Sequence, residues 1–218
     1  MQDIQAAIFD MDGTLVDSLM LWDVLTEAYE KAYPDKIGTV ISEEDNRLMR
    51  VLPLTESMRL LHEHYGLGEN AEELLKLTQA VFLDFYSHRV QLKDGVREFL
   101  KVLRSRGVKM CIASATPLPL VEAALEHCGI RGCFEYLLSC SEIRKGKDVP
   151  DIYLLAKEKM GNLPHTWVFE DAFVAVSTAV GAGFPTVAIY DQYNPYQDKI
   201  EAMADYYVAE GETLLKLL

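Results

Sequence analysis

The chain has 218 residues, half of them hydrophobic, and a formal net charge of −13. This length and composition provide for one large domain, or for a core domain with an insertion, and for a sizeable hydrophobic core. A nucleic-acid-binding protein needs a basic surface, and an anionic membrane repels an acidic protein. We therefore expect neither nucleic acid nor a membrane as partner.

The cysteines and the apolar segments indicate a cytoplasmic protein. The four cysteines form no paired C-x-x-C pattern, and Cys111 lies in an apolar run, so we expect a reduced thiol in the core. The first residues lack the composition of a secretory signal, and no apolar stretch reaches transmembrane length.

The first residues predict a buried strand that ends in two carboxylates. Residues 6–9 are uncharged, as in a strand buried on both faces of a parallel sheet. Asp10 follows directly, and Gly13 permits a sharp turn that brings Asp12 back toward it. Active sites of open α/β sheets lie beyond the carboxyl ends of the strands, and two neighbouring acids repel each other unless a cation separates them. Mg²⁺ suits such a pair, although a simple Asp-Gly turn also explains Asp12 and Gly13.

Residues 18–88 predict a helical insertion. Ser18 is expected to cap an amphipathic helix, Thr55 to cap another, and apolar residues at helical spacing predict a longer helix over 71–87. A short helix is predicted over 46–49. The alternation of apolar and polar residues that is typical of a strand does not occur in this region.

From Asp94 onward, predicted strands and helices alternate along the chain. The predicted strands are residues 108–113, 134–138, 166–169 and 186–190, with a weaker one at 206–208. The predicted helices are residues 95–105, 117–127 with Thr116 as the N-cap, 150–159, 172–182 and 213–217. Alternation of this kind predicts an α/β fold with a doubly wound parallel sheet, here with an inserted all-α domain.

Further polar residues follow these strands at the same predicted edge of the sheet. Ser114, with the N–H groups of Ala115 and Thr116, forms a candidate anion site, although a capping serine explains it equally well. Lys147 lies in a basic loop that could simply be solvated. The Glu170-Asp171 pair ends an apolar strand and needs a charge partner, which a metal shared with Asp10 would supply.

These residues together resemble the motifs of the haloacid dehalogenase-like hydrolases. The resemblance is to the subgroup with a helical cap inserted after the first strand, which includes phosphoglycolate phosphatase and β-phosphoglucomutase. Four motifs match in order: Asp10 to Thr14, Ser114, Lys147 with Pro150 to Tyr153, and Glu170-Asp171. The resemblance covers nearly the whole chain and implies a Rossmann-like core of residues 1–16 and 91–218 with a helical cap of residues 17–90.

The resemblance implies a phosphatase that acts through an aspartyl-phosphate. Asp10 would be the nucleophile, and Asp12 would protonate the leaving oxygen and then deprotonate the attacking water. Ser114, the backbone at Ala115 and Lys147 would bind the phosphate oxygens. The implied substrate is a small phosphorylated metabolite, and caps of this type can function within a monomer or a weak homodimer.

The resemblance also implies Mg²⁺ as the cofactor. Its ligands would be Asp10, the Asp12 carbonyl and Asp171, with Glu170 acting on the metal from behind them. One departure concerns this region, because Ala172 stands where the family usually has a serine that supports the metal site.

The predicted cap would close over the site through hinges near residues 15–17 and 88–93. Candidate substrate-facing residues are Trp22, Arg47 and Arg50, although helix packing for the tryptophan and solvent exposure for the arginines are simpler explanations. His62 and His64, two residues apart, would point to different faces of a helix and do not form a metal pair.

Three other functions remain open on the same fold. A β-phosphoglucomutase-like enzyme would carry a glycine and a basic residue near the start of a cap helix. Residues 51–55 have neither, although Arg50 precedes them, so hydrolysis is favoured. A haloacid dehalogenase is disfavoured because Asp12 and the metal-binding acids serve phosphate chemistry. A non-catalytic binding protein would normally lose Asp10, Asp12 or Lys147, and all three are present.

Overall fold

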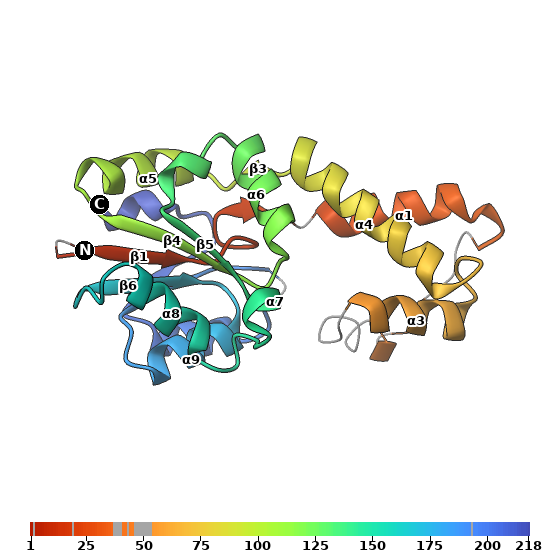
Figure 1. The fold of residues 1–218 in the computed structure, drawn as a ribbon. Helices are drawn as coiled ribbons and strands as arrows, with labels where there is room; N and C mark the ends of the chain where they lie inside the picture. The colour runs from red at the N-terminus through yellow and green to blue at the C-terminus, as the bar shows by residue number, and fades with distance from the viewer. Residues whose placement is uncertain (2, 19, 37–40, 43, 46–53, 193) are drawn as a thin grey trace. The chain divides into compact units, whose positions relative to one another are not determined.

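The computed structural model describes residues 1, 3–18, 20–36, 41–42, 44–45, 54–192 and 194–218, and the chain separates into two compact units. One unit combines Met1–Ser18 with Arg89–Leu218 and contains the large sheet, and the other spans Leu19–His88 and is helical. Figure 1 shows the two units.

The core of the first unit is a six-stranded sheet in which every pair of neighbouring strands is parallel. Its order is β5-β4-β1-β6-β7-β8. The strands are β1 (Ala6–Phe9), β4 (Lys109–Ser114), β5 (Tyr136–Ser139), β6 (Thr166–Glu170), β7 (Thr186–Ile189) and β8 (Tyr206–Val208). Because β1 lies between β4 and β6, the residues that follow it emerge near the middle of the carboxyl edge. The predicted doubly wound parallel sheet is confirmed.

Helices cover both faces of this sheet (Figure 1). They are α5 (Val96–Ser105), α6 (Leu118–His127), α7 (Cys140–Ile143), α8 (Asp151–Lys159), α9 (Phe173–Gly181) and α10 (Gln197–Met203). On one face, Phe9 stacks on Phe169 with ring centroids 4.4 Å apart and meets Phe99 of α5 edge-on. On the other face, Ile8 packs in a cluster with Tyr153 of α8. A strand that helices cover on both faces has no charged side chains, and the uncharged residues 6–9 predict β1 for this reason.

Several elements differ from those predicted. The two-residue strands β2 (Val16–Asp17) and β3 (Gln91–Leu92) form an antiparallel ribbon that joins the two expected hinge segments. Strands of two residues show no periodicity, so the sequence does not predict this ribbon. The sequence does not predict α7 and α10 either, because helices of four and seven residues are too short for a clear helical periodicity. The predicted tail helix is a 3-10 helix over Leu214–Leu217.

Among its described residues, the helical unit contains α1 (Met20–Ala32), a 3-10 helix (Pro34–Lys36), α3 (Leu54–Tyr65) and α4 (Ala71–His88). Its apolar core includes Leu25, Met58 and Leu74, and it encloses a hydrogen bond of 2.5 Å between the hydroxyls of Tyr29 and Thr78. Thr55 lies inside the first turn of α3 and is not its cap, and the helix predicted over 46–49 falls outside the described residues. Among the helices that the structure describes, none combines the length and the apolar character that a membrane span requires.

Candidate active site

The carboxyl end of β1 positions Asp10 at the centre of the sheet edge. The Asp10 N–H donates to the carbonyl of Phe169 at 3.0 Å, so the backbone still follows β6 at this residue. Only 7 % of Asp10 is exposed, and its carboxylate accepts a hydrogen bond from the ammonium of Lys147. The carboxylate is therefore buried, fixed and paired with a cation.

Lys147 lies in the loop after α7 and connects the first and fourth motifs. Its ammonium donates to Asp10 and also to Oε1 of Glu170, the latter at 2.5 Å. The phenolic hydroxyl of Tyr153 donates to the same Oε1 at 2.8 Å. Burial alone would lower the pKa of Lys147, but the carboxylates of Asp10 and Glu170 outweigh burial and raise it above its usual value. The lysine is therefore a permanent cation, and a solvated loop no longer explains it.

Asp10, Glu170 and Asp171 offer carboxylate oxygens that all lie within 4.8 Å of one another. Burial first, and then the charge of Asp10, raise the pKa of Asp171 well above its usual value. When all three carboxyl groups are ionised, the one ammonium of Lys147 leaves two negative charges in this cluster. Hard carboxylate oxygens and a double negative charge fit a divalent cation such as Mg²⁺.

The turn after β1 is closed against Asp171. Gly13 has a φ of 78°, and a Cβ added to it would lie 2.9 Å from Cγ of Asp171, so only glycine fits there. The next residue, Thr14, is buried, and its hydroxyl donates to Oδ1 of Asp171 at 3.1 Å. The same added Cβ would lie 3.1 Å from Oδ2 of Asp191, which identifies a further acid beside the cluster. The close approach of Asp171 explains why the residue after Asp12 is a glycine.

The loop after β4 meets the second carboxylate of the first motif. The hydroxyl of Thr116 donates to Oδ2 of Asp12 at 2.7 Å. The Thr116 N–H, which the sequence places in a candidate anion site, donates to the hydroxyl of Ser114 at 3.0 Å. Ser114 is 1 % exposed at the end of β4, and Ala115 is exposed. The helix α6 starts only at Leu118, with Pro117 as its N-cap, so the prediction that Thr116 caps it is wrong.

The structure adds residues that sequence reasoning did not assign to the site. The sequence identifies Tyr153 only as part of a motif, whereas its hydroxyl donates to Glu170. The Asn194 side-chain amide donates to the carbonyl of Asp171 at 2.7 Å. The Lys93 ammonium donates to the carbonyl of Gly13 and, at 3.2 Å, to that of Tyr190. Bonds to backbone carbonyls place no demand on the partner's residue type, so the sequence offers no signal for them.

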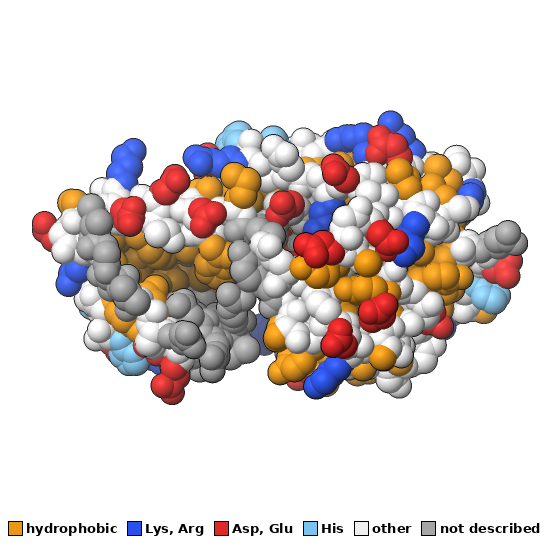
Figure 2. All heavy atoms as spheres, turned by 180° about the vertical axis from the view of Figure 1, so that it is seen from behind, with side chains coloured by type: hydrophobic (Ala, Val, Ile, Leu, Met, Phe, Trp, Pro, Cys, Tyr) orange, Lys and Arg blue, Asp and Glu red, His pale blue; other side chains and the backbone are white. Residues whose placement is uncertain are grey.

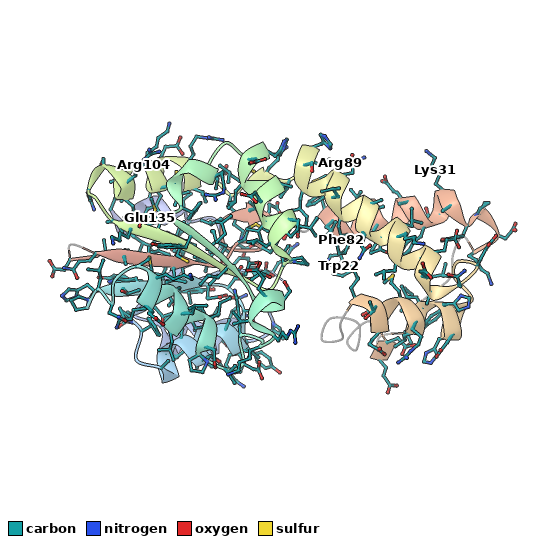
Figure 3. All side chains as sticks on the ribbon, in the orientation of Figure 1. Trp22, Lys31, Phe82, Arg89, Arg104 and Glu135 are labelled. Atoms are coloured by element: carbon teal, nitrogen blue, oxygen red, sulfur yellow. The ribbon has the colours of Figure 1, made fainter. Side chains whose placement is uncertain are left out.

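In the helical unit, Trp22 from α1 and Phe82 from α4 line a cavity of about 330 Å³ (Figure 3). Figure 2 shows hydrophobic side chains gathered around a recess in this unit. Trp22 is half exposed, so helix packing alone does not account for it. Arg47 and Arg50, the other predicted substrate-facing residues, lie outside the described residues.

A family model described as "haloacid dehalogenase-like hydrolase" matches residues 4–183. This match includes every residue of the cluster described above, and it spans both units. The chain therefore belongs to the haloacid dehalogenase-like hydrolases, and the resemblance noted in the sequence is confirmed.

Individual relatives cover nearly the whole chain. The phosphorylated carbohydrates phosphatase of Thermotoga maritima is 28% identical over 213 residues, which are 97% of each protein. Hexitol phosphatase B of Escherichia coli K12 is 30% identical over 193 residues, or 86% of this chain and 84% of the relative. Among solved structures, a candidate β-phosphoglucomutase from Thermotoga maritima superposes with a TM-score of 0.77 at 26% identity, covering 94% of both chains.

Proposed function

We propose that this protein is a Mg²⁺-dependent phosphatase that hydrolyses a small phosphorylated metabolite through an aspartyl-phosphate. The observation that carries the proposal is the cluster of Asp10, Glu170 and Asp171 around the buried ammonium of Lys147. Phosphoryl transfer needs a positioned nucleophile and concentrated positive charge for the phosphate, and this edge of the sheet has residues for both.

The metal in this proposal binds to Asp10, Asp171 and the carbonyl of Asp12. In this proposal Glu170 supports the metal site without binding the metal directly, because Lys147 and Tyr153 both donate hydrogen bonds to its Oε1. When bound, Mg²⁺ shields the negative charge of the nucleophile from that of the phosphate. Ala172 at the N-cap of α9 makes no side-chain capping hydrogen bond, so the support that a serine usually provides there has to come from other residues, such as Thr14.

The chain's own residues move the protons and hold the phosphate oxygens. A carboxylate oxygen of Asp10 forms a bond to phosphorus while the ester oxygen leaves, and Asp12 gives that leaving oxygen its proton. Asp12 then takes a proton from water as the water oxygen attacks phosphorus and the bond to Asp10 breaks. Lys147, the Ser114 hydroxyl and the Ala115 N–H bind the oxygens that stay on phosphorus.

The relatives indicate the class of substrate. Their names, phosphorylated carbohydrates phosphatase and hexitol phosphatase B, point to polyhydroxylated phosphate esters, and we extend this class to the present chain. We assign the helical unit the role of a cap that selects the leaving group, with Trp22 as one contact. The four free cysteines fit a reducing compartment, which supports the expected cytoplasmic location.

A mutase is the second candidate because a candidate β-phosphoglucomutase is among the similar structures. It would share Asp10 and the metal, but it would pass the phosphoryl group to a sugar hydroxyl instead of water. Release of free phosphate from several sugar phosphates supports the phosphatase. Conversion of glucose 1-phosphate without release of phosphate supports the mutase.

The decisive experiment is a panel of phosphorylated metabolites assayed for phosphate release with Mg²⁺ and with EDTA. We expect turnover that requires Mg²⁺, and its loss in Asp10→Asn, whose amide is not a nucleophile. Asp198→Asn, at an exposed acid of α10 in the same unit, is the matched control and should retain the activity. Full activity of Asp10→Asn would refute the assignment of the nucleophile.

A further inference from the structure

Thr116 makes a contact that a helix cap would not make. A capping threonine accepts a hydrogen bond from the helix with its side-chain oxygen, but α6 has no side-chain cap and begins after Pro117. The Thr116 hydroxyl instead donates at 2.7 Å to Oδ2 of Asp12, a residue 104 positions away. The contact therefore joins the loop after β4 to the turn after β1.

Thr116 is itself held at its two backbone polar atoms. Its N–H donates to the hydroxyl of Ser114 at 3.0 Å, and its carbonyl accepts from the hydroxyl of Ser139 at 2.8 Å. Ser139 is completely buried at the end of β5, directly opposite Ser114 in the sheet, and its hydroxyl also lies 2.8 Å from that of Ser141. Two neighbouring strands thus fix the position from which the Thr116 hydroxyl reaches Asp12.

We propose that Thr116 is the positioning residue for Asp12. This inference rests on the proposed function, in which Asp12 gives a proton to the leaving oxygen and later takes one from water. A carboxylate side chain turns about two bonds, and proton transfer requires it within hydrogen-bond reach of both oxygens in turn. A fixed hydroxyl on Oδ2 restricts that rotation before the substrate arrives, so less conformational freedom is lost at each proton transfer.

A merely structural role for Thr116 predicts a different response to substitution. If the residue only fills space, valine replaces it without loss, because the two side chains have nearly the same shape. If the hydroxyl positions Asp12, valine abolishes the contact, whereas serine keeps it. The methyl group and the hydroxyl are thereby tested separately.

The experiment compares Thr116→Val, Thr116→Ser and the control Thr166→Val. Thr166 is a buried threonine in the same unit, with its hydroxyl donating to the carbonyl of Leu163 at 2.6 Å at the start of β6. We expect Thr116→Val to lower kcat by about 10- to 100-fold with little change in KM, the loss typical of a misplaced catalytic group. Thr116→Ser should recover most of this loss, and Thr166→Val should turn over like the wild type.

Rapid mixing with p-nitrophenyl phosphate distinguishes the two chemical steps. The p-nitrophenolate ion leaves without being protonated, so the first step depends little on Asp12, whereas hydrolysis of the aspartyl-phosphate still needs it as a base. We expect Thr116→Val to release about one equivalent of p-nitrophenol in a burst before a slow steady state. Equal slowing of both steps, or activity of Thr116→Val equal to that of the wild type, would overturn the proposal.

A crystallographic readout tests the contact without any enzyme activity. The wild type and Thr116→Ser should show Asp12 in one conformation, and Thr116→Val should show it displaced or in several. A wild type that hydrolyses no phosphate ester would refute the proposed function alone, while an Asp12 that keeps its position in Thr116→Val would refute the positioning role. If Thr116→Val does not fold, Ser139→Ala, which releases the Thr116 carbonyl, should show the same burst with a smaller loss of kcat.

Discussion

Replacing Lys147 by methionine is predicted to destabilise the sheet-containing unit strongly. The side chain of Lys147 is 11% exposed, and those of its partners Asp10 and Glu170 are 9% and 1% exposed. At 2.5 Å from Glu170 and an effective dielectric constant of about 20, one such pair attracts by about 7 kcal/mol before desolvation is counted. Desolvation offsets several kcal/mol for each ion, so we expect a net loss of about 3–5 kcal/mol when Lys147 is removed.

The loss of stability in Lys147→Met should decrease as the pH is lowered. Burial raises the pKa of Glu170, and the ammonium of Lys147 opposes this shift. Without that ammonium, the pKa of Glu170 in the folded state rises further. Ionisation of a buried carboxyl with a raised pKa destabilises the folded state, so stability is lost as the pH rises through that pKa. At about pH 5, Glu170 of the variant can be protonated at a cost of about 1 kcal/mol, since the pKa of a glutamate in the unfolded chain is about 4.3. The destabilisation should therefore be much smaller at about pH 5 than at about pH 8.

The assay is urea unfolding in EDTA, followed by the fluorescence of Trp167 in β6. A Trp22→Phe background removes the signal of the helical unit. Lys145→Met is the matched control, because Lys145 of the same loop pairs with Asp151 while both side chains are largely exposed, and it should cost less than about 1 kcal/mol. A Lys147→Met protein that unfolds at the same urea concentration as this control, or whose loss is equal at both pH values, would refute the reasoning.

Three further predictions concern the same unit. Gly13→Ala should lose Mg²⁺-dependent turnover and at least about 1–2 kcal/mol of stability, since the residue has a positive φ and its Cβ would displace Asp171; unchanged turnover would contradict this. Mg²⁺ should raise the Tm more at about pH 8 than at about pH 5, because burial and then Asp10 raise the pKa of Asp171 and protons compete with the metal; equal shifts would contradict it. Burial raises the pKa of the Cys111 thiol to about 12, so iodoacetamide should modify it only after unfolding, as mass spectrometry of the labelled peptides can show.

The sequence alone determined the class of fold and the edge at which charged residues gather. Residues 6–9 and 166–169 had to be uncharged because helices cover both faces of the sheet, so the acids that follow them stand out. Parallel strands bring their carboxyl ends to one edge, so the sequence predicts that Asp10 and Asp171 are neighbours. Helical periodicity likewise predicted α4 nearly to its ends.

The tertiary structure alone decided which polar side chains meet. Nothing local in the basic loop indicated that Lys147 would lie between Asp10 and Glu170, and the pattern around Thr116 indicated a helix cap instead of a partner for Asp12. Asn194 binds a backbone carbonyl, which every residue type supplies. Periodicity reports the burial of a segment, whereas a contact between loops more than a hundred residues apart depends on strand order, on register and on the direction in which each side chain leaves its turn.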